Sequence, residues 1–228
     1  MMFYRVIIVS LFLSLSVSLF GMEIKSADAD TAQYLKNPNY HQQIAMYDMY
    51  KTKQANIVML GNSLTHGANW NQLLGRENVV EMGIPSDLVE GMLNRLEYVY
   101  NLKPKVVFIL GGINDIYSWI PLETIMVNYI QILKNLEIRG IKPVVQSVVY
   151  AGEKWPNSAD RNQQVEKFNR MLKQYARKNN IKYIDLNKSM SENKFLKDEL
   201  TIDALHFNAK GFKVWAREIE KVLQKEGL

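Results

Sequence analysis

Short runs of apolar, largely β-branched residues constrain the fold of this 228-residue chain more than any other feature. The clearest run spans 105–110 (K-V-V-F-I-L) and stops at two glycines. Continuous apolar runs are typical of parallel strands that are covered on both faces. We therefore expect a sheet of about five parallel strands. The expected strands are 56–60, 78–82, 105–110, 143–149 and 182–186.

Helical periodicity fills the gaps between these runs. Apolar residues recur every three or four positions within 88–100, 125–136, 165–175 and 212–223. Strands that alternate with amphipathic helices indicate an α/β protein, a three-layer α/β/α sandwich around a doubly wound sheet. In such sheets, ligands bind at the carboxyl ends of the strands.

The start of the chain differs from the rest in composition. Arg5 precedes an apolar stretch at 6–20, and Ala27-Asp28-Ala29 offers a small-x-small cleavage site. This pattern predicts a signal peptide at 1–29, a peripheral helix within 30–54 and one catalytic domain at 55–228. We expect export to the periplasm or the medium, with only transient membrane contact. The alternative is an uncleaved membrane anchor formed by residues 6–20.

Composition excludes several classes of function. The chain has no cysteine, so disulfides and thiolate chemistry are excluded. Three scattered histidines make a metal site improbable, and we expect no cofactor. No phosphate-binding loop and no dinucleotide fingerprint is present. The net charge of +5 comes from lysines and arginines spread along the chain, which does not indicate nucleic-acid binding.

Polar residues follow the first three expected strands and precede the last helix. Ser63, Gly83 and Asn114 follow the strands, and Asp203 and His206 lie three residues apart. A serine becomes a nucleophile when a base takes its proton and a third group orients that base. Each residue alone could instead serve as a cap or turn residue. Together they predict covalent ester hydrolysis.

Four short motifs make the chain resemble the SGNH or GDSL hydrolase family. They are G-N-S-L-T at 61–65, M-G-I-P-S at 82–86, G-I-N-D at 112–115 and D-A-L-H at 203–206. The resemblance covers roughly residues 55–225 and implies a flavodoxin-like SGNH hydrolase fold. One departure is Asn62, which stands where the family usually has an aspartate that is not the triad acid. This change puts the electrostatic environment of the serine in doubt.

The resemblance implies a role for each matching residue. Ser63 would be the nucleophile, His206 the general base and Asp203 the acid that orients it. The oxyanion hole would consist of the backbone N–H groups of Ser63 and Gly83 and the side-chain amide of Asn114. His66, three residues from the nucleophile, competes with His206 as base but has no carboxylate near it in the sequence.

Substrate specificity is expected from the loops at the carboxyl edge of the sheet. Asn62, His66, Tyr117, Trp119 and Trp155 are the candidate substrate-binding residues. The first expectation is removal of acetyl groups from carbohydrates through an acyl-enzyme. A lysophospholipase, thioesterase or general short-chain esterase is the alternative among enzymes. A catalytically silent glycan-binding domain is the alternative of a different class. The sequence does not indicate an oligomeric state.

Overall fold

The computed structural model describes residues 32–227, so the expected signal peptide at 1–29 lies outside the described residues. Five parallel strands form one sheet in the order β2-β1-β3-β4-β5. The strands are β1 (Ile57–Gly61), β2 (Val79–Gly83), β3 (Val106–Leu110), β4 (Lys142–Gln146) and β5 (Lys182–Ile184). The predicted α/β fold with a doubly wound parallel sheet is confirmed.

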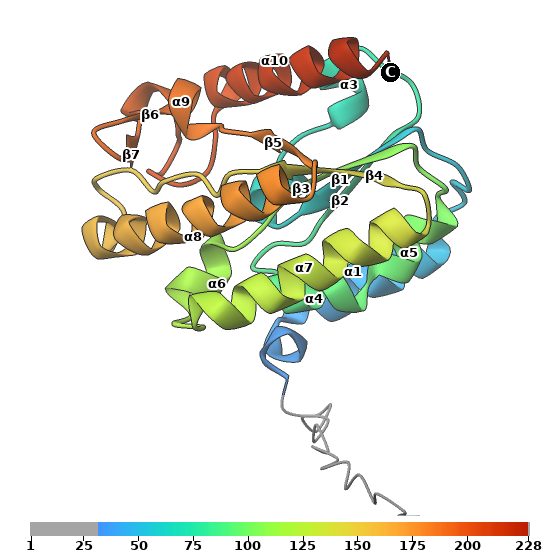
Figure 1. The fold of residues 1–228 in the computed structure, drawn as a ribbon, viewed down its shortest axis with the longest axis horizontal. Helices are drawn as coiled ribbons and strands as arrows, with labels where there is room; N and C mark the ends of the chain where they lie inside the picture. The colour runs from blue at the N-terminus through green and yellow to red at the C-terminus, as the bar shows by residue number, and fades with distance from the viewer. Residues whose placement is uncertain (1–31, 228) are drawn as a thin grey trace, which may run out of the picture.

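Helices cover both faces of this sheet (Figure 1). On one face lie α3 (Trp70–Leu74), α9 (Asn187–Met190) and α10 (Ala209–Glu226). On the other lie α1 (Pro38–Met49), α4 (Val89–Asn94), α5 (Leu96–Asn101), α7 (Leu122–Ile138) and α8 (Ser158–Lys178). Smaller elements are η2 (Gln33–Lys36), α2 (Ser63–His66), α6 (Ile113–Tyr117), the hairpin β6 (Ser191–Glu192) and β7 (Phe195–Leu196), and η3 (Asp198–Leu200).

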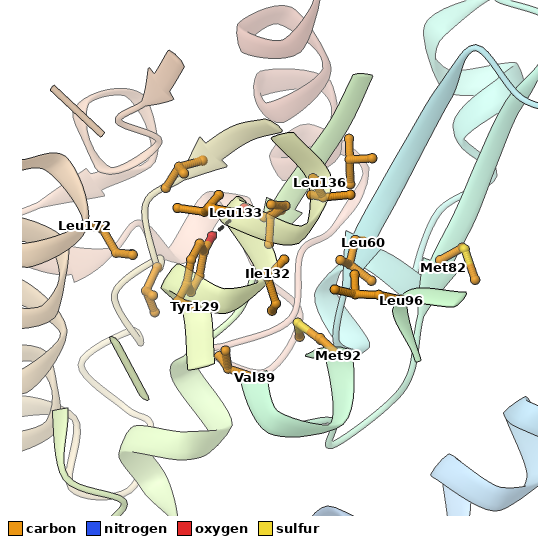
Figure 2. Close-up of a cluster of buried hydrophobic side chains, with 14 of the residues drawn as sticks. Leu60, Met82, Val89, Met92, Leu96, Tyr129, Ile132, Leu133, Leu136 and Leu172 are labelled. Atoms are coloured by element: carbon orange, nitrogen blue, oxygen red, sulfur yellow. Dashed lines mark hydrogen bonds between the residues drawn. The ribbon is translucent and has the colours of Figure 1, made fainter. Parts of the chain in front are cut away.

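The core consists of two apolar clusters, one on each face of the sheet. Successive side chains of a strand point to opposite faces, so Val107 and Ile109 enter one cluster while Phe108 enters the other. Figure 2 shows side chains of α4 and α7 packed together in the first cluster. The buried Tyr129 of α7 donates its hydroxyl to the carbonyl of Ile109 at 3.1 Å. This bond satisfies the only polar atom of a side chain that is otherwise part of the core.

Two helices differ from the sequence expectation. The periodic segment 88–100 is broken at Arg95, which has φ −113° and separates α4 from α5. The guanidinium of Arg95 is directed into the core, where it contacts Asp87 and the carbonyl of Gly61. The first helix, expected within 30–54, spans Pro38–Met49, so residues 50–54 lie outside it. Among the described residues, no helix has the length and apolar character needed to cross a membrane.

The strand order reverses direction between β1 and β3, which creates a topological switch point. Gly61 at the end of β1 is level with Gly83 of β2 and Leu110 of β3. The loops that leave these three strands therefore begin at the same edge of the sheet. A switch point is where ligands bind in open α/β sheets.

Candidate active site

The expected nucleophile lies in a tight turn between β1 and α2. β1 ends at Gly61, and Ser63 is the first residue of α2. Asn62 between them is fully buried, and its Oδ1 accepts the backbone N–H of Leu64 at 3.1 Å. This bond caps α2 and fixes the residue next to Ser63. Asn62 has no exposed surface in this structure, and its contact with substrate stays a prediction.

The expected base and acid share one short turn before α10. Thr201 forms a bridge with Phe207, and its hydroxyl donates to the carbonyl of His206 at 2.7 Å. Ala204, at the tip, has φ 72° in the left-handed region. Asp203 Oδ1 accepts the backbone N–H of His206 at 2.7 Å. These bonds close the turn on itself and hold both side chains at one end of it.

The turn and α2 together place three reactive groups in a row. Ser63 Oγ lies 3.0 Å from His206 Nε2, and His206 Nδ1 lies 2.7 Å from Asp203 Oδ2. In the neutral tautomer with a proton on Nδ1, the ring donates to Asp203 and accepts from Ser63. Burial raises the pKa of Asp203, but N–H donors from His206 and Leu205 outweigh it, so the pKa lies below its usual range. Asp203 is therefore ionised at neutral pH.

Gly83, an expected oxyanion donor, has its backbone N–H engaged elsewhere. This N–H donates to the Glu81 carboxylate. The position still requires a glycine, because a Cβ there would lie 2.6 Å from the carbonyl of Asn62. The second oxygen of Glu81 lies 3.4 Å from His66 Nδ1, which supplies the carboxylate partner that the sequence near His66 lacks. In this structure Gly83 therefore differs from the expectation of an open donor.

A better placed donor follows Gly83 in the same loop. The N–H of Asp87 donates to the carbonyl of Ile84 at 3.1 Å, which closes a four-residue turn. Pro85 is its second residue, and Ser86 is its third with φ 61°, as type II turns require. Ser86 is exposed, and no acceptor in the described part of the chain takes its backbone N–H. The Pro-Ser-Asp sequence is the signal that identifies this turn.

Asn114 is positioned by the same loop. Its Nδ2 donates to the carbonyl of Asp87 at 2.8 Å, which places Asn114 beside Ser86. An amide nitrogen carries two hydrogens, so one remains for a ligand. The backbone N–H of Ser63 has no carbonyl partner within α2, because Ser63 occupies its first position. Three donors therefore surround the edge of the sheet where Ser63 lies.

Two of the candidate aromatic residues occupy different parts of the rim. Trp155 lies edge-on to the His206 ring, with 6.3 Å between ring centroids. Its loop is bonded to the turn that holds Asp203 and His206, because the N–H of Gly152 donates to the carbonyl of Ala204 at 2.6 Å. Trp119 is 77% exposed and lies in the segment after α6.

A buried ion pair lies in the core next to the site, and the sequence pattern does not predict it. Arg95 Nε donates to Asp87 Oδ2 at 2.9 Å, and Arg95 Nη2 donates to the carbonyl of Gly61 at 2.9 Å. Both side chains are fully buried. The pair links the loop after β2 to the strand end just before Ser63. A separation of eight residues gives no local sequence signal for this contact.

Asp115, beside Asn114, is also buried and accepts the backbone N–H of Val89 at 3.0 Å. This bond satisfies a backbone donor at the start of α4. Asp115 therefore has a structural role at the start of α4. Across residues 32–227, no three histidine, aspartate or glutamate side chains gather as ligands of a metal ion.

The family model described as the GDSL-like lipase/acylhydrolase family matches residues 59–214. This range contains β2 to β7, the last three residues of β1, the turn with Ser63 and the turn with Asp203 and His206. The match therefore includes all the residues that form the geometry above.

Individual proteins are more distantly similar. The N-acylneuraminate cytidylyltransferase of Streptococcus agalactiae serotype V is 26% identical over 162 residues, which are 71% of this chain. The chain spans only 37% of the length of that relative. A GDSL-like lipase structure from Bacteroides thetaiotaomicron has a TM-score of 0.71 at 23% identity, covering 82% of this chain and 98% of the other. An acetyl xylan esterase structure has a TM-score of 0.64 at 19% identity, covering 73% and 97%. At these identities the two structures show a shared fold.

Proposed function

The chain belongs to the GDSL-like lipase/acylhydrolase family and is an esterase or acylhydrolase, and from this premise we propose that it removes short acyl groups, chiefly acetyl, from carbohydrates. The observation that supports the chemistry best is the row of Ser63, His206 and Asp203, with separations of 3.0 and 2.7 Å. In this proposal the three residues act as nucleophile, base and orienting acid.

The first half-reaction forms an acyl-enzyme. Ser63 Oγ attacks the ester carbonyl carbon while His206 Nε2 takes the hydroxyl proton. The tetrahedral oxyanion accepts hydrogen bonds from the N–H groups of Ser63 and Ser86 and from the amide of Asn114. The C–O bond to the sugar then breaks, and the imidazolium returns its proton to the leaving sugar oxygen. Asp203 stabilises the imidazolium throughout.

The second half-reaction restores the enzyme. Water attacks the acyl carbon, and His206 takes one of its protons. The bond to Ser63 Oγ breaks, Oγ regains the proton from His206, and the carboxylic acid leaves. The same donors stabilise the second oxyanion, because it forms at the same carbonyl oxygen.

Two observations support a sugar as the leaving group. The ring of Trp155 lies beside His206, where a flat aromatic side chain suits packing against a sugar ring. The names of two similar proteins also refer to carbohydrates, an acylated sugar acid in one and acetylated xylan in the other. Lysophospholipid and thioester substrates remain the alternatives among acyl compounds.

Hydrolysis of p-nitrophenyl acetate tests the chemistry. We expect turnover by the natural chain and a loss of at least about 10⁴-fold in Ser63→Ala and in His206→Ala, with an unchanged melting temperature. Rates on acetyl, octanoyl and palmitoyl esters of one leaving group then test acyl preference. Faster turnover of the long chains would favour a lipase or lysophospholipase. A folded protein without any turnover that binds acetylated glycan would instead indicate a binding domain.

We also propose that the chain is exported by means of residues 1–29. The support is the apolar stretch at 6–20 after Arg5 and the small residues Ala27 and Ala29. N-terminal sequencing of the protein from cell fractions tests this. A mature chain that begins near residue 30 outside the cytoplasm is expected, and an intact Met1 in the membrane fraction would favour the anchor.

A further inference from the structure

Arg161 is a buried arginine without an acidic partner. It lies in the first turns of α8 and is only 4% exposed. Within the described residues, no carboxylate or carbonyl oxygen pairs with its guanidinium, and its Nε is enclosed without any hydrogen-bond partner. The guanidinium instead lies over two aromatic rings. The Cζ atom lies 3.1 Å from the ring centroid of Trp119 and 5.6 Å from that of Tyr117.

Arg95, the other buried arginine among the described residues, has the acidic partner that Arg161 lacks. Arg95 is also enclosed, but it pairs with Asp87 at 2.9 Å and donates to a carbonyl. Removing a charge from water is costly unless a partner compensates for it. Arg95 has a carboxylate to balance its charge, although its Nη1 is buried without a partner, whereas Arg161 has only aromatic faces beside it. The difference indicates that the partner of Arg161 arrives with a ligand.

A second polar group beside Arg161 is also unsatisfied. The hydroxyl of Tyr117 is buried and has no hydrogen-bond partner. Burial raises the pKa of Tyr117 to about 12, although Arg161 opposes the shift, so the hydroxyl keeps its proton. It can therefore donate to an anion that the guanidinium also binds.

Trp119 fixes the orientation of the guanidinium. Its ring lies against the flat face of Arg161, and the donors of a guanidinium all point outward in its plane. Because Nε is enclosed, the edge formed by the two Nη atoms is the one that remains for two parallel hydrogen bonds. This edge matches a carboxylate, whose two oxygens accept such a pair. One guanidinium also balances a single negative charge.

This cluster lies at the rim of the active site. Tyr117 and Trp119 are at the end of the short segment that begins with Asn114 of the oxyanion hole. Arg161 follows the loop of Trp155, whose ring lies 6.3 Å from that of His206. Figure 1 shows α6 below α8, and the two helices are in contact. The cluster thus links the segment that follows Asn114 with the segment that follows Trp155.

We propose that Arg161, with Tyr117, binds a carboxylate on the sugar that carries the acetyl ester, so that the substrate is an acetylated acidic sugar. This inference rests on the proposed esterase function and specifies its substrate class. Arg161 is a specificity-determining residue and takes no part in bond making. Trp119 holds the guanidinium in place and offers its exposed ring to the sugar.

A matched substrate pair tests the proposal. The two substrates are the methyl glycoside of an O-acetylated hexuronic acid and the same compound with its carboxyl group methylated. Acetate release is measured for both. We expect kcat/KM to be about 10- to 100-fold higher for the free acid, the size of a charge-assisted hydrogen-bonded pair. A ratio near one in a chain that hydrolyses p-nitrophenyl acetate would overturn this inference and leave the proposed function intact.

Variants identify the residue responsible. Arg161→Met should bring the ratio close to one, and Arg161→Lys should restore part of it. Arg170→Met, on the same helix but 63% exposed in its side chain, is the matched control and should keep the ratio. A merely structural Arg161 would lower both rates equally and lower the melting temperature. Tyr117→Phe, which removes only the hydroxyl, should reduce the ratio less than Arg161→Met.

Competition separates a carboxylate from a phosphate. Methyl hexuronoside without acetate should inhibit the natural chain and should inhibit Arg161→Met at least about tenfold more weakly. Stronger inhibition by inorganic phosphate than by the uronoside, lost in Arg161→Met, would assign the site to phosphate and overturn the proposal. Binding of the uronoside to Ser63→Ala, measured by calorimetry, tests the site even if no ester is hydrolysed.

Discussion

Aspartates in two regions of this molecule are held in opposite ways. Asp203, on the catalytic turn, is 40% exposed in its side chain, and N–H donors keep its pKa low. Asp87 and Asp115, beneath the loops, are buried, and burial raises their pKa values to about 6 and about 7. The carboxylate that we propose remains charged during turnover lies where water and N–H groups stabilise the charge. The carboxylates of Asp87 and Asp115, which bond to neighbouring segments of the fold, are buried.

Replacing Asp203 with asparagine is the strongest test of this contrast. The change keeps the shape but removes the charge that stabilises the imidazolium and selects its tautomer. We expect kcat on p-nitrophenyl acetate to fall about 10⁴-fold while the melting temperature changes little. A large loss of stability would show that the catalytic turn also supports the fold.

Arg95→Met should have the opposite profile. It leaves Asp87 as an unpaired buried charge, so we expect the free energy of unfolding to fall by about 3–5 kcal/mol in urea titrations. The double variant Asp87→Leu with Arg95→Met should regain part of this loss, because no charge is then left alone. A double variant less stable than Arg95→Met would contradict the ion-pair explanation.

Asn114→Ala tests the residue that joins the two regions. Asn114 donates to the carbonyl of Asp87, and we propose that its second amide hydrogen binds the oxyanion. Loss of one oxyanion donor typically costs about 10²–10³ in rate, so kcat should fall far more than KM rises. Equal kcat values for the variant and the natural chain would remove Asn114 from the oxyanion hole.

The raised pKa of Asp115 should make the stability of the protein depend on pH, an effect smaller than those above. Its pKa is raised in the folded state to about 7, so between about pH 4 and pH 7 the folded chain holds a proton that the unfolded chain releases. The free energy of unfolding should therefore decrease as pH rises through this window, by up to about 1.4 kcal/mol per pH unit. Asp115→Asn should flatten that slope, as measured by urea titrations at several pH values.

Much of the fold follows from local sequence patterns. The run at 105–110 is buried throughout as β3, because its residues suit a strand covered on both faces. The helix expected across 88–100 breaks because Arg95 serves a contact with Asp87 and Gly61, and periodicity carries no information about such a contact. Helix periodicity is local, whereas the break results from tertiary structure.

In the site, too, local motifs predict some features, whereas tertiary structure determines others. Ser63, Asp203 and His206 could be proposed from the sequence because each lies in a short motif at an element boundary. The engagement of Gly83 by Glu81 and the open N–H of Ser86 depend on backbone direction, which residue identity alone does not report. The isolation of Arg161 is likewise visible only after every neighbouring carboxylate has been placed.

The self-contained turn that holds Asp203 and His206 has an evolutionary consequence. Thr201, Asp203 and His206 bond to one another, so the acid and the base are inherited together in one segment of about seven residues. A recombination event that exchanged this segment would transfer a complete proton-accepting pair. The neighbouring loop with Trp155 could then diversify without a change in the chemistry. Such an arrangement lets related enzymes change their ester specificity while the proposed catalytic residues stay the same.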